Sequence, residues 1–121
     1  MELNEYQNKA MSTCLQSCNN FAYMGFGLMG EVGELAGKVA KAIRKQKSII
    51  ENNAFITERG SNHMTEQEIH DLKSEIGDCA WFIAGLCSVM GWELEEIAKE
   101  NLAKLASRQQ RNVIVGDGDN R

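Results

Sequence analysis

Apolar residues recur at three- and four-residue steps along two long segments, and this spacing constrains the fold of the chain more than any other feature. In residues 26–46 the repeating positions are Leu28, Val32, Leu35, Val39 and Ile43. In residues 65–90 they are Ile69, Leu72, Ile76, Cys79, Ile83, Leu86 and Met90. Such steps place side chains on one face of a helix, so both segments are predicted to be amphipathic helices whose apolar stripes pack together.

Two further helices are predicted, over residues 3–19 and 94–110, and no segment alternates as a strand would. Thr65 and Glu68 have the spacing of a capping box at the start of the third helix, and Gly91 is expected to end it. Residues 47–64 are polar and are predicted to form an irregular loop, and residues 112–121 a tail. The predicted fold is all-α, a four-helix bundle in a single domain over residues 1–121. Because a chain of this length buries a small core, an oligomer is expected.

Charge and composition exclude several classes of protein. The net charge is −4 and no lysine or arginine run occurs, so no nucleic-acid partner is expected. No stretch reaches the roughly 18 apolar residues of a membrane span, and the first ten residues lack the features of a signal peptide. The 4 cysteines form no CxxC pair and are predicted to be reduced thiols in a cytoplasmic protein, with a disulfide framework as the alternative.

Two pairs of acidic residues lie beside the apolar stripes. Glu31 and Glu34 stand three residues apart on the second predicted helix, and Glu75 and Asp78 have the same spacing on the third. At about 100° per residue, both pairs fall on the same flank of their stripes. If the two helices pack antiparallel along these stripes, the two-fold relation between them brings the flanks together. All four carboxylates are therefore predicted to converge.

Converging carboxylates repel one another unless a cation neutralises them. Oxygen ligands suit a hard cation, so Mg²⁺ is the predicted cofactor, with Mn²⁺ as an alternative. Such an ion bridges phosphate oxygens, and a carboxylate that remains free orients or deprotonates a water molecule. Two other interpretations stay open: the acids are only solvated, or Glu34 and Lys38 form a surface salt bridge at the i, i+4 spacing.

The motifs GEVGE at residues 30–34 and SEIGD at residues 74–78 resemble the ExxE and ExxD pattern of the MazG-type family. The segment ELEEIAKENLAKLASRQ in the fourth helix is similar to the N-x-x-K-[LF]-x-x-R pattern of the same family. The resemblance extends from about Gly25 to the closing GDGDNR. The family consists of all-α nucleoside triphosphate pyrophosphohydrolases, which fold as helical bundles and assemble into dimers or tetramers. Its members cleave a nucleoside triphosphate into the monophosphate and pyrophosphate.

The resemblance implies roles for individual residues. The catalytic metal ligands it implies are Glu31, Glu34, Glu75 and Asp78, and the implied phosphate contacts are Asn101, Lys104 and Arg108. Lys104 and Arg108 share one helical face, so two cations are available there to offset triphosphate charge. The resemblance further implies a nucleoside triphosphate substrate, a homodimer or homotetramer, and removal of excess or damaged nucleotides. Two alternatives stay open: a hydrolase specific for dUTP or dCTP, and a non-catalytic helical module that binds a partner.

Overall fold

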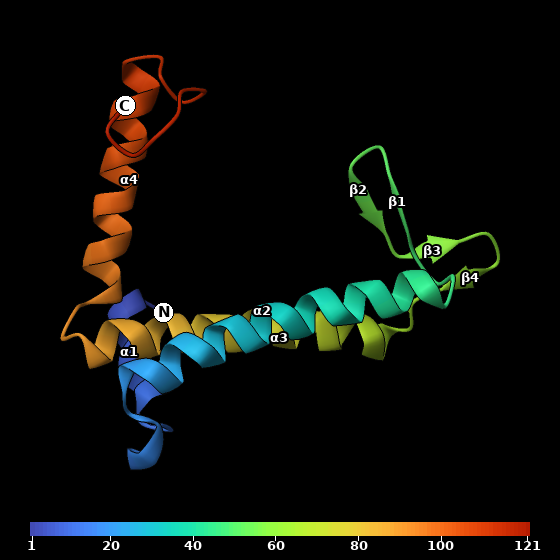
Figure 1. Cartoon of the computed structure of the whole chain (residues 1–121), viewed down its shortest axis with the longest axis horizontal. Coiled ribbons are helices and arrows are strands. Elements are labelled where there is room, and N and C mark those ends of the chain that lie inside the picture. Colours follow the sequence, from blue (N-terminus) through green and yellow to red (C-terminus); the bar gives the residue numbers. More distant parts are fainter.

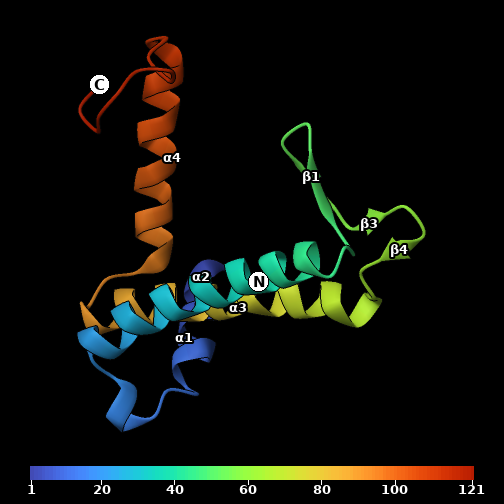
Figure 2. The same cartoon turned by 45° about the vertical axis from the view of Figure 1, so that its right-hand side comes forward.

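The computed structural model describes residues 1–121 and confirms the all-α fold class. The helices are α1 (Leu3–Met11), α2 (Phe21–Arg44), α3 (Glu66–Val89) and α4 (Leu94–Gln110), and a 3₁₀ turn, η1 (Gln16–Cys18), joins α1 to α2. The long helices α2 and α3 run antiparallel and side by side, α1 packs against α3, and α4 rises from the end of the pair where α3 finishes (Figure 1, Figure 2). No helix is both long enough and apolar enough to cross a lipid bilayer.

Side-chain caps mark the starts of the two long helices. Asn20 Oδ1 accepts a hydrogen bond from Tyr23 N at 2.8 Å. Because of this cap, α2 begins at residue 21, whereas the sequence predicts a start at residue 26. Thr65 and Glu68 form the predicted capping box at the start of α3. Both caps satisfy backbone N–H groups that have no partner within the helix.

The first helix is shorter than predicted, because α1 ends at Met11 and not near residue 19. The hydroxyls of Ser12 and Thr13 donate hydrogen bonds of 2.6 Å to the carbonyls of Lys9 and Ala10. Such local bonds offer the backbone an alternative to the next helical turn. The chain then passes through η1 before it reaches α2.

Small residues allow α2 and α3 to lie close together. A Cβ atom at Gly27 would overlap the ring of Phe82, and a Cβ atom at Gly85 would overlap the side chain of Met24. Met24 and Phe82 are both buried, so each fills the space that a glycine on the opposite helix leaves open. We call these two helices the α2–α3 pair.

The face that joins α2 to α3 differs from the predicted one. The sequence predicts contact along stripes centred near Val32 and Val39 on α2, but Val32 is 52% exposed, and Ile83 of the α3 stripe is 42% exposed. The helices meet instead along the faces that carry the small residues Gly27 and Gly85, because bulky side chains would hold the backbones further apart. Val32 of the α2 stripe and Ile76 and Ile83 of the α3 stripe are therefore exposed, and so are Phe26 and Met29 of α2. Together these side chains give the pair exposed apolar surface.

The sequence predicts an irregular loop over residues 47–64, but the structure forms two β-hairpins there. β1 (Ile49–Glu51) pairs antiparallel with β2 (Ala54–Ile56), and β3 (Glu58–Arg59) pairs with β4 (Asn62–His63). Asn52 and Asn53 have φ angles of 52° and 63°. Positive φ at both central residues is the conformation of a type I′ turn. The asparagines that suggested an irregular loop therefore form the turn of the first hairpin.

Helix α4 stands away from the α2–α3 pair and is anchored at its start (Figure 1, Figure 2). Leu94 N donates a hydrogen bond to Gln7 Oε1 at 2.8 Å, and Gln7 Nε2 donates to the carbonyl of Trp92 at 2.9 Å. Further along α4, Leu102 and Leu105 are exposed. Since only 12 of the 121 residues are buried, one chain alone encloses a small core.

Candidate active site

Three of the four predicted acidic residues meet between α2 and α3. Glu31 and Glu34 extend from α2, and Glu75 extends from α3. One carboxylate oxygen from each residue lies within 4.8 Å of the other two. We call Glu31, Glu34 and Glu75 the acidic cluster. Their approach is possible because the two helix backbones are held close together at Gly27 and Gly85.

The negative charges of the site act most clearly on Glu31. Burial raises the pKa of Glu31, and a hydrogen bond to Glu75, which only the protonated form can donate, raises it further. The charges of Glu34 and Asp78 shift the pKa in the same direction. Asp78 is exposed and lies outside the acidic cluster, although its charge contributes to the raised pKa of Glu31. The site therefore carries more negative charge than its own cations compensate.

Glu75 is the buried member of the acidic cluster. Its side chain is 9% exposed, and its Oε1 atom lies 3.1 Å from Lys38 Nζ. Its Oε2 atom is buried and has no hydrogen-bond partner. Buried polar atoms in proteins nearly always have a partner, and a buried carboxylate is costly without one. The unsatisfied oxygen therefore indicates that the site binds something further.

The acidic cluster fits a divalent cation. Its donor atoms are carboxylate oxygens, which are the ligands that Mg²⁺ and Mn²⁺ prefer. A bound cation would supply the missing partner of Glu75 Oε2 and would remove the repulsion that raises the pKa of Glu31. Glu34 is exposed, so the site is open to solvent on one side.

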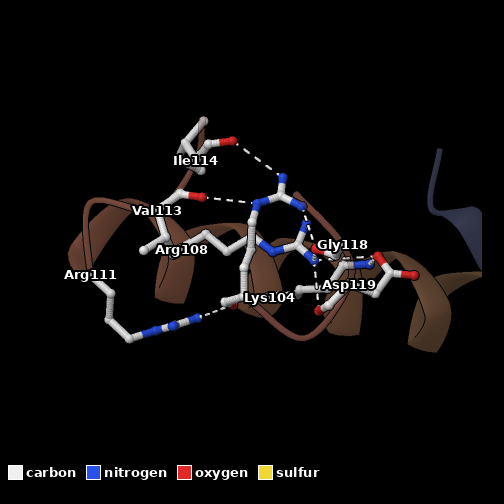
Figure 3. A network of polar contacts seen from close by, with 8 residues as sticks. Lys104, Arg108, Arg111, Val113, Ile114, Gly118 and Asp119 are labelled. Atoms are coloured by element: carbon white, nitrogen blue, oxygen red, sulfur yellow. Dashed lines mark hydrogen bonds and ion pairs between the residues drawn. The ribbon is translucent and has the colours of Figure 1, made fainter. Parts of the chain in front are cut away.

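The cations predicted to contact phosphate lie on α4 and hold a carboxylate of their own chain (Figure 3). Arg108 is buried, and its Nη2 atom donates hydrogen bonds to the carbonyl and to Oδ1 of Asp119, at 2.8 Å and 3.3 Å. Lys104 Nζ lies 3.5 Å from the same Oδ1 atom. The hydrogen bond from Arg108 and the charge of Lys104 lower the pKa of Asp119. Asn101, one turn earlier on α4, is exposed.

Further hydrogen bonds fold the rest of the tail back onto α4. Arg121 Nε donates to the carbonyl of Val113 at 2.9 Å, and Arg121 Nη2 donates to the carbonyl of Ile114 at 3.2 Å. Arg111 Nη2 donates to the carbonyl of Arg121 at 2.7 Å. Residues 112–121 thus form a closed loop over the end of α4, and Asp119 is part of that loop (Figure 3). The sequence gives no signal for this contact because glycines and aspartates are typical of an open tail.

The two groups of predicted site residues are separate within one chain. The acidic cluster lies along the α2–α3 pair, whereas Asn101, Lys104 and Arg108 lie on α4, which points away from it (Figure 1, Figure 2). Lys104 and Arg108 form ion pairs with Asp119, and neither forms one with the acidic cluster. The basic residue that contacts the cluster directly is Lys38 of α2, which the sequence suggests only as a partner of Glu34.

Comparison with known proteins identifies the family of the chain. Residues 20–113 match the family model of the MazG nucleotide pyrophosphohydrolase domain. The chain therefore belongs to the MazG nucleotide pyrophosphohydrolase family. It is also 34% identical to the Gene 37 protein of Mycobacterium phage L5 over 128 residues, an alignment that covers all of both chains. No solved structure was found to match the chain.

Proposed function

We propose that this protein is a Mg²⁺-dependent nucleoside triphosphate pyrophosphohydrolase, with Mn²⁺ as an alternative ion. The reaction is hydrolysis of a nucleoside or deoxynucleoside triphosphate to the monophosphate and pyrophosphate. The observation that carries the proposal is the meeting of three carboxylates, one of which, Glu75, has a buried and unpartnered Oε2 atom. Membership of the MazG family supports the same reaction class.

The acidic cluster and the neighbouring residue Asp78 take roles that depend on the exposure of each side chain. Glu31, Glu34, Glu75 and Asp78 would hold the ion, and a bound ion supplies positive charge to phosphate oxygens. The exposed carboxylates of Glu34 and Asp78 are accessible to water, so one of them accepts the proton of the attacking water molecule. The water oxygen forms a bond to the α phosphorus. The bridging P–O bond breaks, and pyrophosphate leaves with that electron pair.

An assembly of two or four copies completes the proposal. The apolar surface of the α2–α3 pair is exposed over Phe26, Met29, Val32, Ile76 and Ile83. Large exposed apolar side chains gathered on one pair of helices are typical of an interaction site, and a small core favours association. In such an assembly Asn101, Lys104 and Arg108 of one copy approach the acidic cluster of another and contact the substrate phosphates. Displacement of Asp119 from Lys104 and Arg108 would accompany that contact.

The physiological role that we propose is removal of excess or damaged nucleotides in the cytoplasm. All four cysteines are free, which suits a reducing compartment. A panel of ribonucleotides and deoxynucleotides, assayed with Mg²⁺ and with Mn²⁺, tests the proposal when the products are identified.

We expect monophosphate and pyrophosphate from several bases. Cleavage of dUTP or dCTP alone would replace the broad activity with a narrow one. No turnover of any nucleotide with either ion would contradict the enzymatic proposal and favour a helical module that binds a partner.

A further inference from the structure

A small groove lined by lysines lies next to the acidic cluster. It is formed where the C-terminal part of α2 faces the N-terminal part of α3, and its volume is about 120 Å³. The lining residues are Lys38, Lys41, Ala42, Lys45, Met64, Glu68 and Asp71. Lys38 belongs to both places, because it lines the groove and its Nζ atom lies 3.1 Å from Glu75 Oε1. Through Lys38 the groove therefore lies directly beside the acidic cluster.

The charges in the groove leave two lysines free. Lys38 is paired with Glu75, and Glu68 is paired with Lys47 at 2.7 Å. Lys41 and Lys45 line the groove without any carboxylate within ion-pair distance. Asp71 also lines the groove and forms no ion pair, and its Oδ1 atom accepts a hydrogen bond from Gln67 at 2.8 Å. The groove thus has an excess of positive charge within reach of an anion.

Helix geometry arranges the lysines in a row that leads away from the acidic cluster. Lys38, Lys41 and Lys45 follow one another at three- and four-residue steps and so share a face of α2. At a rise of about 1.5 Å per residue, Lys41 lies roughly one turn beyond Lys38, and Lys45 lies one turn further. The cavity is smaller than the roughly 300–1,000 Å³ of pockets that enclose a drug-sized ligand. Its size and lining suit phosphate groups rather than a nucleoside.

We propose that this groove binds the pyrophosphate end of the substrate, so that Lys41 and Lys45 hold the β and γ phosphates and then the leaving pyrophosphate. The inference rests on the proposed function, and it assigns the phosphate charge to lysines of the same chain as the acidic cluster. These residues differ from Lys104 and Arg108, which share an ion pair with Asp119 of their own chain. Asp71 opposes the bound anion and limits how tightly the product is retained.

Calorimetric titration with inorganic pyrophosphate in the presence of Mg²⁺ tests the groove without turnover. We expect Lys41→Gln and Lys45→Gln each to weaken pyrophosphate binding by about tenfold, the effect of one lost charge-assisted hydrogen bond. Arg44→Gln is the matched control, because it removes the same charge from an exposed position on α2 that does not line the groove. It should change the dissociation constant less than about twofold. Binding of a nucleoside monophosphate should be unaffected in all three variants.

Asp71→Asn provides a test with the opposite sign. Removal of this carboxylate should tighten pyrophosphate binding, whereas a general loss of folding would weaken it in every variant. The groove is refuted if Lys41→Gln and Lys45→Gln match Arg44→Gln, or if Asp71→Asn weakens binding. These outcomes are separate from failure of the proposed function. Wild-type protein that cleaves no nucleotide would contradict the enzyme, while lysine-dependent binding of pyrophosphate would still support the groove.

Discussion

The α2–α3 pair and helix α4 differ in how tightly they pack and in whether their charged side chains have partners within the chain. The pair is held close by Gly27 and Gly85, and it brings carboxylates together with an unpartnered oxygen at Glu75. Helix α4 stands free of the pair (Figure 1), and its cations Lys104 and Arg108 share an ion pair with the single carboxylate of Asp119. A buried polar atom of the pair therefore has no partner within the chain, whereas the cations of α4 have a partner in their own tail.

The largest expected effect is loss of nucleotide hydrolysis when the acidic cluster of the α2–α3 pair is altered. Glu75→Gln should reduce nucleotide hydrolysis by at least about 100-fold, because it removes the buried charge around which the cluster is built. Mg²⁺ should raise the melting temperature of the wild type and not that of Glu75→Gln. Glu66→Gln, an exposed acid on the same helix, is the control. Equal activity of Glu75→Gln and Glu66→Gln would contradict the claim that nucleotide hydrolysis depends on the acidic cluster of the α2–α3 pair.

The close packing of the pair predicts the next largest effect. Gly85→Ala places a Cβ atom against the sulfur of Met24, so we expect a loss of about 1–3 kcal/mol in the free energy of unfolding. Gly37→Ala, where no atom lies within 4 Å, should instead gain up to about 1 kcal/mol. Thermal unfolding of both variants measures the difference. The same sign for both substitutions would show that the glycine contact does not control the packing of the helices.

The contacts of Glu68 are expected to make the free energy of unfolding depend on pH in the acid range. The hydrogen bond from Lys47 and the backbone bond at Thr65 lower the pKa of Glu68 to about 2. Since the folded pKa lies below the ordinary value of about 4.3, this contribution is complete above that value and is lost as the pH falls toward 2. Glu68→Gln should retain the capping hydrogen bond and lose this part of the pH dependence. Unfolding midpoints between pH 2 and pH 6 compare the two proteins.

The smallest expected effect concerns the tail on α4. Asp119→Asn removes the charge that Lys104 and Arg108 hold, so amide hydrogens of residues 112–121 should exchange faster while those of α2 and α3 remain protected. The pKa of Asp119 is lowered by these cations, so the contact is present at neutral pH and weakens in acid. Unchanged exchange in the tail would indicate that Asp119 does not hold it in place.

Local signals in the sequence predict the helices well. Apolar spacing identifies α2 and α3, and the capping box at Thr65 fixes the start of α3. The same spacing misplaces their interface, because periodicity shows that a face is apolar but not what covers it. Val32 and Ile83 belong to the predicted stripes and remain exposed in the chain. The acids approach one another because the helices meet at the small residues beside the stripes.

Other features depend on contacts that short segments do not encode. The hairpin turn at Asn52 and Asn53 contains the residue type of an irregular loop, and only its backbone angles distinguish the two. The pairing of Asp119 with Arg108 requires the tail to fold back, which spacing along α4 cannot reveal. The sequence predicts Lys38 only as an ion-pair partner of Glu34, one helical turn away. In the structure α3 packs against α2, and Lys38 instead forms an ion pair with Glu75.

The most direct test of the account is a crystal structure of the protein grown with Mn²⁺ and measured for anomalous scattering. The account predicts an anomalous peak coordinated by Glu31, Glu34 and Glu75, with the Oε2 atom of Glu75 among its ligands. A structure in which these three carboxylates bind no ion at saturating Mn²⁺, and Glu75 Oε2 keeps no partner, would contradict it.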